Sequence, residues 1–466
     1  MMKDTNREQY RRLVRSIAVF VILVMESFVF RYVWNNYYSK GLWLEPFYAK
    51  GNIFIVVVYA VFMLFFMSIY GGFKLGYIKR GNLIYSQALS GLCANAVIYL
   101  QIVLLYRRLP DIRPLLVMTV TDIVIITVCS SAFDRLFTHI FPPREMLLIY
   151  DEYPVDLLWG KVESRKDKFI IKEQISVKET IDVIHNKIME YIQGGVLLGD
   201  IHAADRNQIL KFCYEHSIRV YLTPKISDII VRNAEALHLF DTPLLLCRNY
   251  GLNIGQRIMK RTLDLIAGIL LLIVSSPFML ITAIAIKAYD KGPVLFKQKR
   301  LTIGGKEFYV YKFRSMIVNA EKDGVARLAT SGDKRITPVG KIIRATRLDE
   351  LPQLFNIIKG DMSLVGPRPE RPEIAKEYEK EIPEFAFRLK VKAGLTGYAQ
   401  IYGKYNTTAY DKLKLDLMYI ESYSFISDLK LILSTLKIMF MKESTEGIDE
   451  KQTIAIHKKS EGEEND

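Results

Sequence analysis

The first third of the chain is dominated by four long apolar runs separated by short polar stretches. A helix needs roughly 20 apolar residues to cross a bilayer, and each run is about that long. The pattern therefore predicts a four-helix transmembrane domain over residues 1–140. Its spans run approximately over residues 13–34, 53–70, 83–106 and 115–137.

Ionisable residues lie within these runs, among them Glu26 and Arg31 in the first and Asp122 in the fourth. Such groups face neighbouring helices or reach the interface, so a structural role is expected. Lysines and arginines near the ends of the spans predict that both ends of the domain are cytoplasmic. The residues that favour this orientation are Arg7, Arg11, Arg12, Arg15, Arg135 and Arg144, whereas Arg107, Arg108 and Arg113 argue against it.

Residues 146–250 change to short apolar strands alternating with helical stretches, which predicts a Rossmann-like module with a largely parallel sheet. The strand-like segments are MLLIY, KFIIK, GGVLLGD and RVYLT. The turn after the first reads YDEYPVD and lacks the glycines that let a backbone approach a pyrophosphate. The pattern thus favours an interaction or regulatory module without a nucleotide fingerprint.

A further apolar run, residues 260–289, carries Ser276 and Pro277 near its middle. Proline removes a helical hydrogen bond and clashes with the preceding turn, so the segment must bend there. Both flanks are basic, and each half is too short to span a bilayer alone. This predicts a re-entrant helix that dips into one leaflet, with a kinked full span as the alternative.

The end of the chain has two further features. The stretch SFISDLKLILSTLKIMFMK repeats apolar residues at helical spacing with lysines between them, which is typical of a helix lying in the membrane interface. Residues 442–466 are polar and charged, which predicts a disordered tail.

The composition of the chain limits the classes of partner and metal site that are expected. The 466-residue chain has a formal net charge of +14, which suits phosphate-bearing partners such as anionic lipid or nucleotide. No nucleic-acid motif is present, so nucleic acid is not expected as a partner. The four cysteines show no CxxC pairing, which supports neither a zinc site nor a disulfide framework.

Two adjacent acids, Asp349 and Glu350, stand in the stretch RATRLDELPQLFNIIKGDMSLVGPRPE. Apolar residues at helical spacing follow them and Gly360 ends the pattern, so a helix is predicted to start at the acids. Pro352 would then occupy the first turn. Acids also cap helix starts, and this remains the alternative to a catalytic role.

Basic residues surround the two acids along the sequence. Lys312 and Arg314 fall on one face of the strand-like FYVYKFRSM, and Pro367 and Pro369 fix the backbone around Arg368. Cations that converge on one helix start indicate a phosphate site. Those that precede the acids are Arg335, Lys341, Arg344 and Arg347.

The nearby cations are expected to lower the pKa of the acids and keep them ionised. An ionised carboxylate in such a field suits either a nucleophile toward phosphorus or a ligand for Mg²⁺. Neighbouring residues on a helix point about 100° apart, so the two acids are expected to divide these roles.

An ordered set of motifs makes the chain resemble the bacterial sugar transferase family, the monotopic polyprenol-phosphate phosphoglycosyltransferases. The resemblance covers roughly Gln256 to Phe440, and with the four spans and the αβ module the whole chain resembles the long form of that family. The motifs are KRTLDLIAGILLLIVSSPF, GPVLFKQKR, KFRSM, RATRLDELPQLFNIIKGDMSLVGPRPE and KAGLTGYAQIYG.

The resemblance implies a catalytic domain of α/β type over residues 256–441. It implies transfer of a sugar 1-phosphate from a UDP-sugar to undecaprenyl phosphate with release of UMP, with Mg²⁺ as cofactor. Asp349 maps to the family's nucleophile, which forms a phosphosugar-aspartate, and Glu350 to its paired glutamate, so the metal is expected at these two acids. Arg344 and the segment Pro367, Arg368 and Pro369 map to positions near the phosphates or nucleotide, and Ser276 and Pro277 map to the break of the re-entrant helix.

The same resemblance implies a homodimer in the bacterial inner membrane, with the catalytic domain on the cytoplasmic face. It implies the first membrane step of exopolysaccharide, capsule or O-antigen synthesis. Two alternatives remain at this point: a glycosyltransferase that releases UDP, and a non-catalytic nucleotide-sugar sensor or scaffold. No residue visibly reads a hexose hydroxyl, so the sequence does not select the sugar.

Overall fold

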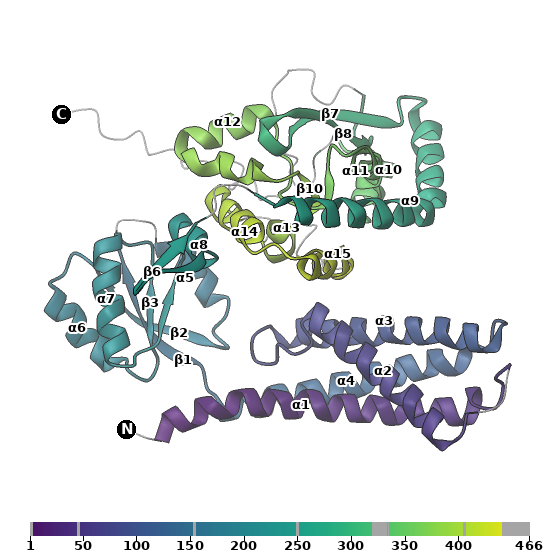
Figure 1. Cartoon of the computed structure of the whole chain (residues 1–466), viewed down its shortest axis with the longest axis horizontal. Coiled ribbons are helices and arrows are strands. Elements are labelled where there is room, and N and C mark those ends of the chain that lie inside the picture. The colour runs from purple at the N-terminus through teal and green to yellow at the C-terminus, as the bar shows by residue number, and fades with distance from the viewer. Residues whose placement is uncertain are drawn as a thin grey trace. The chain divides into compact units, whose positions relative to one another are not determined.

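The computed structural model describes residues 3–43, 47–151, 155–247, 251–318, 333, 335–403 and 407–439 (Figure 1). The chain divides into two compact units, Met1–Thr223 and Pro224–Asp466. The tail predicted over residues 442–466 lies outside the described residues.

The described part of unit 1 begins with four long helices that pack on one another, α1 with α2 and α4, and α3 with α2 and α4. All four are long and apolar enough to cross a membrane. Their inner faces bury large side chains, whereas many apolar side chains, such as Phe20 and Phe28, point outward. The helices are α1 (Lys3–Val33, continued by the π-helical turn η1, Trp34–Tyr38), α2 (Ala49–Tyr70), α3 (Arg80–Tyr106) and α4 (Arg113–Ile140).

Glu26 of α1 and Asp122 of α4 face the interior, as expected. Glu26 and Asp122 are both buried, and Asn95 donates a hydrogen bond to Asp122 at 3.1 Å. Arg31 instead lies exposed near the end of α1. A lipid-facing acid would be costly, so helix packing accounts for the position of both carboxylates.

The second part of unit 1 is the predicted parallel sheet, with strand order β2-β1-β3-β4 and every pair parallel. Alternate residues of β1 face opposite sides: Leu147 and Ile149 pack under α6 and α7, and Met146 and Leu148 pack under α5. The strands are β1 (Arg144–Tyr150), β2 (Phe169–Ser176), β3 (Val196–Leu198) and β4 (Val220–Leu222); the helices are α5 (Val155–Glu163), α6 (Ile181–Glu190) and α7 (Ala203–Glu215).

Unit 2 begins with α8 (Ile226–Arg232) and a hairpin of β5 (Glu235–Leu239) and β6 (Thr242–Leu246). All the residues of these two strands are exposed, although several are leucines. The described residues of this unit form helices and three two-stranded sheets: β5–β6 and β7–β8 are antiparallel, and β9–β10 is parallel.

The remaining elements of unit 2 enclose an apolar core that includes Leu354, Ile357 and Leu417, and a smaller cluster of Ile286, Phe313 and Ile343. In chain order they are α9 (Ile254–Asp290), β7 (Leu295–Leu301), η2 (Ile303–Gly305), β8 (Glu307–Phe313), α10 (Pro338–Ala345), η3 (Leu348–Glu350), α11 (Gln353–Lys359), β9 (Ser363–Val365), α12 (Pro372–Glu381), η4 (Pro383–Lys390), β10 (Gly394–Thr396), α13 (Tyr398–Tyr402), α14 (Ala409–Glu421) and α15 (Phe425–Met439).

Helix α9 contains Pro277 and turns a corner along its length (Figure 1). Proline at 277 cannot donate to the carbonyl of Ile273, four residues earlier. The hydroxyl of Ser276 donates to that carbonyl instead, at 2.8 Å. The serine therefore satisfies the acceptor that the proline leaves free, and the helix continues through the bend.

The first limb of α9 is fixed to the core of unit 2 by buried polar contacts. Lys260 Nζ donates to Asp428 at 2.7 Å and to the hydroxyl of Tyr419 at 2.9 Å. Asp264 accepts hydrogen bonds from Ser363 Oγ and from the backbone N–H of Leu364, both at 2.9 Å. Many apolar side chains farther along α9 are exposed, which marks a surface for a membrane or a partner.

Candidate active site

Asp349 and Glu350 lie in the 3₁₀ turn η3, between α10 and α11. The prediction that a helix starts at the acids is wrong, because α11 begins only at Gln353. Pro352 has no N–H to continue a helix backward, and the turn closes through shorter bonds. The N–H of Glu350 donates to the carbonyl of Arg347, and that of Leu351 to the carbonyl of Leu348, each at 3.2 Å.

Three cations converge on one oxygen of Glu350. Its Oε1 lies 2.8 Å from Arg368 Nη2, 3.4 Å from Lys312 Nζ and 4.0 Å from Arg347 Nη1. Burial alone would raise the pKa of Glu350, but Arg368 and Lys312 outweigh it and hold the pKa well below the usual range. Glu350 is therefore ionised and already engaged, as the basic sequence context predicted.

Asp349 differs from its neighbour. In the described part of the chain its carboxylate accepts no hydrogen bond, although Lys312, Arg344 and Arg347 act on it through space. Burial, and then the negative charge of Glu350, raises the pKa of Asp349 to about 6. The expectation of a lowered pKa is thus wrong for this acid, because burial outweighs the cations. Asp349 is a carboxylate free to react or bind.

The turn that carries Arg368 is anchored through its backbone. Arg388 Nη2 donates to the carbonyl of Arg368 at 2.8 Å, and Arg300 Nη1 donates to the carbonyl of Pro369 at 3.1 Å. Before the turn, Gly366 passes so close to the backbone preceding β10 that an added Cβ would lie 2.4 Å from the carbonyl oxygen of Lys392. Together with Pro367 and Pro369, these contacts hold Arg368 toward Glu350.

Of the remaining predicted residues, some lie near the acid pair and one does not. Lys312 reaches the acid pair from the end of β8, and Arg344 stands in the last turn of α10. Arg314, expected on the same face as Lys312, instead makes a fork with both oxygens of Asp290 and donates Nε to the carbonyl of Pro293 at 2.7 Å. Its geometry ties the end of β8 to the end of α9, away from Glu350.

Comparison with known proteins then places the site in a family. The profile described as bacterial sugar transferase matches residues 255–442, a range that contains every one of these residues. A protein of Caulobacter vibrioides named UDP-glucose:undecaprenyl-phosphate glucose-1-phosphate transferase is 42% identical over 181 residues, which are 38% of this chain and 67% of that protein. The chain belongs to the bacterial sugar transferase family.

Two further relatives of this sugar transferase carry names with N-acetylgalactosamine and with glucose. One from Aeromonas hydrophila, named UDP-N-acetylgalactosamine-undecaprenyl-phosphate N-acetylgalactosaminephosphotransferase, is 38% identical over 247 residues, 52% of this chain and 57% of that protein. A UDP-glucose:undecaprenyl-phosphate glucose-1-phosphate transferase from Klebsiella pneumoniae is 42% identical over 219 residues, 46% of this chain and 45% of that protein. The chain thus spans about half the length of these two relatives.

Sequence reasoning about the sugar transferase missed the two arginines that anchor the Arg368 turn. Both arginines are far from the acid pair along the chain. Arg300 ends the motif GPVLFKQKR, which gives it no role at the Arg368 turn, and Arg388 lies in none of the motifs. Their role appears only when β7 and η4 fold beside the turn. A second buried contact, Arg388 Nη2 to Asp416 at 2.7 Å, also fixes the Arg388 guanidinium.

Proposed function

We propose that the chain transfers a sugar 1-phosphate from a UDP-sugar to undecaprenyl phosphate, releasing UMP, through a phosphosugar intermediate on Asp349. The observation that carries the proposal is the unequal acid pair: three cations hold Glu350, whereas Asp349 has no hydrogen-bond donor among the described residues. Family membership and the names of the relatives support the same reaction class.

In the first step, an oxygen of Asp349 attacks the sugar-bearing β-phosphorus, and the bond from that phosphorus to the oxygen bridging to the α-phosphate breaks. UMP leaves with the bond's electron pair. In the second step, an oxygen of the lipid phosphate attacks the same phosphorus, and the bond to Asp349 breaks, which restores the carboxylate. Lys312, Arg347 and Arg368, which contact Glu350, would offset the charge on the phosphate oxygens.

The acid pair also fits the Mg²⁺ that the family implies. Mg²⁺ binds through one or two carboxylates and completes its ligands with phosphates and water. Asp349 offers free oxygens, whereas the contacts of Glu350 with cations all involve Oε1. We therefore assign the metal chiefly to Asp349, with Glu350 as the second acid. When bound, Mg²⁺ would neutralise charge on the phosphate oxygens.

Product analysis tests the reaction. The full chain in detergent or nanodiscs is given undecaprenyl phosphate and a panel of UDP-sugars labelled at the β-phosphorus. We expect UMP, a labelled lipid diphosphate-sugar and a labelled protein when the lipid is omitted. Release of UDP would favour the alternative glycosyltransferase, and no turnover with any sugar would favour the alternative sensor or scaffold. The panel also selects the sugar, which the relatives' names leave open between glucose, galactose and N-acetylgalactosamine.

The raised pKa of Asp349 predicts an unusual pH dependence. Carbodiimides react with protonated carboxyls, and without Mg²⁺ the labelling of Asp349 should be half-maximal near pH 6, about where its pKa lies. Asp333, whose pKa is lowered by hydrogen bonds from Arg335, should lose labelling at lower pH. The measurement is peptide mass spectrometry across pH, and equal profiles for the two residues would contradict the prediction.

The sign of the linked stability follows from the same pKa. Because the folded state raises this acid's pKa above its unfolded value, ionising Asp349 costs folding free energy at pH above about 6. That cost is removed as pH falls through 6 toward the ordinary carboxyl pKa. The nucleophile is therefore active in the pH range where it weakens the fold.

Arg388 is expected to act as a positioning residue for Arg368. Arg388→Lys keeps a cation beside Asp416 but loses the planar fork that also reaches the carbonyl of Arg368. We expect adduct formation to slow by about tenfold to a hundredfold, since small displacements of a charged group have large effects on rate. The readout is single-turnover labelling, with thermal unfolding to check the fold.

The control for Arg388→Lys is Lys380→Met, which removes an exposed cation from α12. A rate that stays at the wild-type value in a folded Arg388→Lys variant would show that the turn holds Arg368 without this contact.

For the membrane arrangement we propose four spans, α1 to α4, with both ends cytoplasmic, and α9 as a re-entrant helix. This would put the chain in the bacterial inner membrane with unit 2 at its cytoplasmic face, where a lipid phosphate lies. The bend and the exposed apolar side chains of α9 support the proposal. The pathway would be the first membrane step of exopolysaccharide, capsule or O-antigen synthesis.

The bend gives a prediction for topology. Pro277→Leu restores an N–H for the carbonyl of Ile273 and should straighten α9, moving one flank across the membrane. Cysteines placed singly at Arg257 and Lys291 in a cysteine-free background report the change through labelling by an impermeant reagent. Wild-type flanks should label from the same side, and unchanged labelling in Pro277→Leu would show that other residues set the return.

We further propose a homodimer. The hairpin β5–β6 supports it, because its exposed side chains include Leu237, Leu239, Leu245 and, at the tip, Phe240. An exposed apolar hairpin of this kind is typical of a partner surface. Crosslinking and mass measurement of the purified chain test it, with Phe240→Ser expected to shift the population to monomer.

A further inference from the structure

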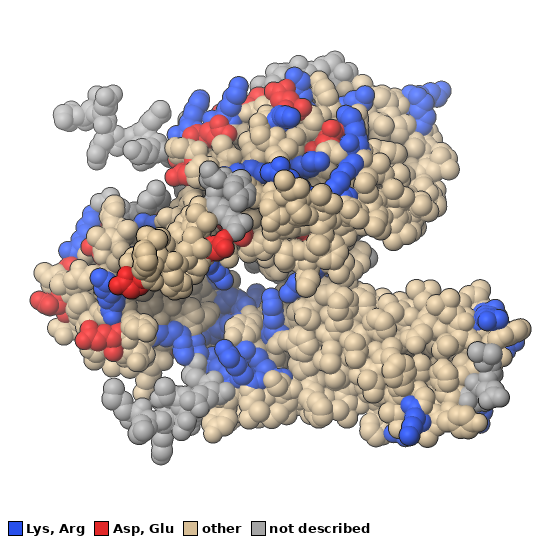
Figure 2. All heavy atoms as spheres, viewed as in Figure 1, with Lys and Arg blue, Asp and Glu red and all other residues tan. Residues whose placement is uncertain are grey.

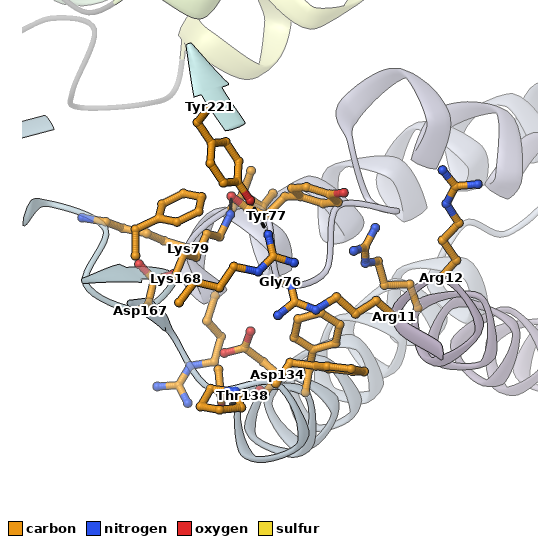
Figure 3. A pocket seen from close by; sticks show the side chains of 18 of the residues that line it. Arg11, Arg12, Gly76, Tyr77, Lys79, Asp134, Thr138, Asp167, Lys168 and Tyr221 are labelled. Atoms are coloured by element: carbon orange, nitrogen blue, oxygen red, sulfur yellow. Dashed lines mark hydrogen bonds between the residues drawn. The ribbon is translucent and has the colours of Figure 1, made fainter. Parts of the chain in front are cut away.

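Unit 1 contains a large cavity that is lined only by residues of that unit. Its volume is about 1140 Å³, which is ample for a small phosphate-bearing ligand. The lining comes from the start of α1, the loop Gly76–Arg80 between α2 and α3, the end of α4 and the α/β sheet. In Figure 3, Arg11 from α1, Asp134 from α4 and Lys168 from the turn before β2 face a common space.

The cavity lies at the edge of the sheet where strands begin. Arg144 starts β1, Phe169 starts β2, and Arg219 directly precedes β4. Nucleotides in open parallel sheets bind at the opposite edge, beyond the carboxyl ends of the strands. The cavity is therefore distinct from the usual nucleotide crevice, and it is formed jointly by the sheet and the ends of the apolar helices.

The lining is strongly basic. Figure 2 shows lysines and arginines gathered at one end of the apolar helices, whose long sides carry few charges. Two acids also line the cavity, Asp134 and Asp167, and Arg165 already pairs with Asp167 at 2.7 Å. The cations outnumber them: Arg11, Arg12, Arg15, Lys79, Arg80, Arg144, Lys168 and Arg219.

Several of these cations are held in place rather than extended into solvent. The Arg15 guanidinium lies 4.2 Å from the centre of the Tyr77 ring, and that of Arg11 lies 4.9 Å from the centre of the Phe141 ring. Lys168 Nζ donates to the carbonyl of Tyr77. Arg15 Nε is buried and has no hydrogen-bond partner among the described residues. A buried donor of this kind is costly unless a ligand accepts from it.

Mutual repulsion adds to this cost. Burial, and then the positive charge of Arg165, lowers the pKa of Lys168 to about 8, and Arg15 and Arg11 contribute in the same direction. A bound anion would reduce the repulsion among these cations and would accept a hydrogen bond from Arg15 Nε. The cavity lies at the ends of apolar helices, where lipid headgroups are expected, so both lipids and soluble compounds could reach it.

We propose that this cavity binds a phosphate-bearing anion, either the headgroup of an anionic lipid or a soluble phosphate compound. The site goes beyond the proposed transfer reaction, because none of its residues belongs to unit 2. Phosphate oxygens would accept from Arg15 Nε and the neighbouring guanidinium and ammonium groups, and the aromatic rings would keep the arginines aligned.

Hydrogen exchange of the full chain tests the site. The chain is placed in nanodiscs of phosphatidylcholine alone, of phosphatidylcholine mixed with phosphatidylglycerol, or of phosphatidylcholine with added inorganic pyrophosphate. We expect slower exchange in the loop Gly76–Arg80 and the turn Asp167–Phe169 with one of the probes. Protection by phosphatidylglycerol alone identifies a lipid headgroup, and protection by pyrophosphate identifies a soluble phosphate.

The matched variants are Arg15→Gln with Lys168→Gln in the cavity, and Arg113→Gln with Lys172→Gln as the control. Arg113 is an exposed arginine at the opposite end of α4, and Lys172 pairs with Glu145 outside the cavity. The cavity variant should need about 30-fold more of the effective probe for half-maximal protection, as expected for loss of two phosphate-binding cations. The proposal is overturned if neither probe protects the wild type, or if the cavity variant responds like the control.

Discussion

Asp349→Asn should abolish the phosphosugar adduct and slow turnover by at least about a thousandfold. The amide has almost the same size as the carboxylate but is not a nucleophile toward phosphorus. Because burial raises the pKa of Asp349, replacing it removes an ionisation that the fold disfavours, so thermal stability should be unchanged or higher. The measurements are single-turnover labelling from a UDP-sugar labelled at the β-phosphorus, and thermal unfolding of the same preparation.

The control for this variant is Asp361→Asn. Asp361 follows α11 and pairs with Lys359 at 3.0 Å. The Asp361→Asn variant should therefore form as much labelled adduct as the wild type. Retention of the adduct by Asp349→Asn would exclude Asp349 as the nucleophile. Loss of the adduct together with loss of folding would mean that the acid pair is primarily structural.

Lys260→Met should have the largest effect on stability. Lys260 and Asp428 form an ion pair at 2.7 Å with side chains almost fully buried, and the hydroxyl of Tyr419 joins both. Removing the lysine leaves a buried carboxylate without its cation, which typically costs about 3 to 5 kcal/mol. We expect hydrogen exchange in α15 to accelerate accordingly, and α9 to loosen from the core of unit 2.

The double variant Lys260→Met with Asp428→Leu separates two explanations. If the cost of the single change comes from the unpaired acid, the double variant should recover much of the protection in α15, because a buried ion pair and an apolar pair are often similar in net stability. If both variants are equally loosened, the contact matters through its geometry. Wild-type exchange in Lys260→Met would contradict the prediction.

Much of the fold follows from residue patterns that are local. The four apolar helices lie where their sequence predicts, because each apolar run extends over many residues. The strands of the parallel sheet overlap the short apolar segments that predicted them. The hairpin β5–β6 has no such signal. Its residues are all exposed, so no alternation of buried and exposed positions marks the two strands in the sequence. The small parallel sheet β9–β10 of unit 2 likewise depends on partners distant in sequence, such as Ser363 with Gly394.

The candidate site was only partly accessible from the sequence. The two acids, Lys312 and Arg368 are brought together as expected, whereas Arg314 pairs with an acid at the end of α9 that no spacing rule connects to it. The opposite pKa shifts of Asp349 and Glu350 were also out of reach. The two acids are adjacent and have nearly the same sequence context. Only the folded structure shows that, among the described residues, the cations contact Glu350 and not Asp349.

Arg347 imposes a constraint on how this turn can change. Its φ of 58° is a left-handed conformation that glycine adopts readily and most other residues adopt at a cost. Glycine would ease the backbone but remove one of the three cations around Glu350, whereas lysine would keep the charge and the strain. The backbone conformation at residue 347 thus favours glycine, whereas the charge of Glu350 favours a cation. Arginine keeps the cation at the cost of a less favourable backbone conformation.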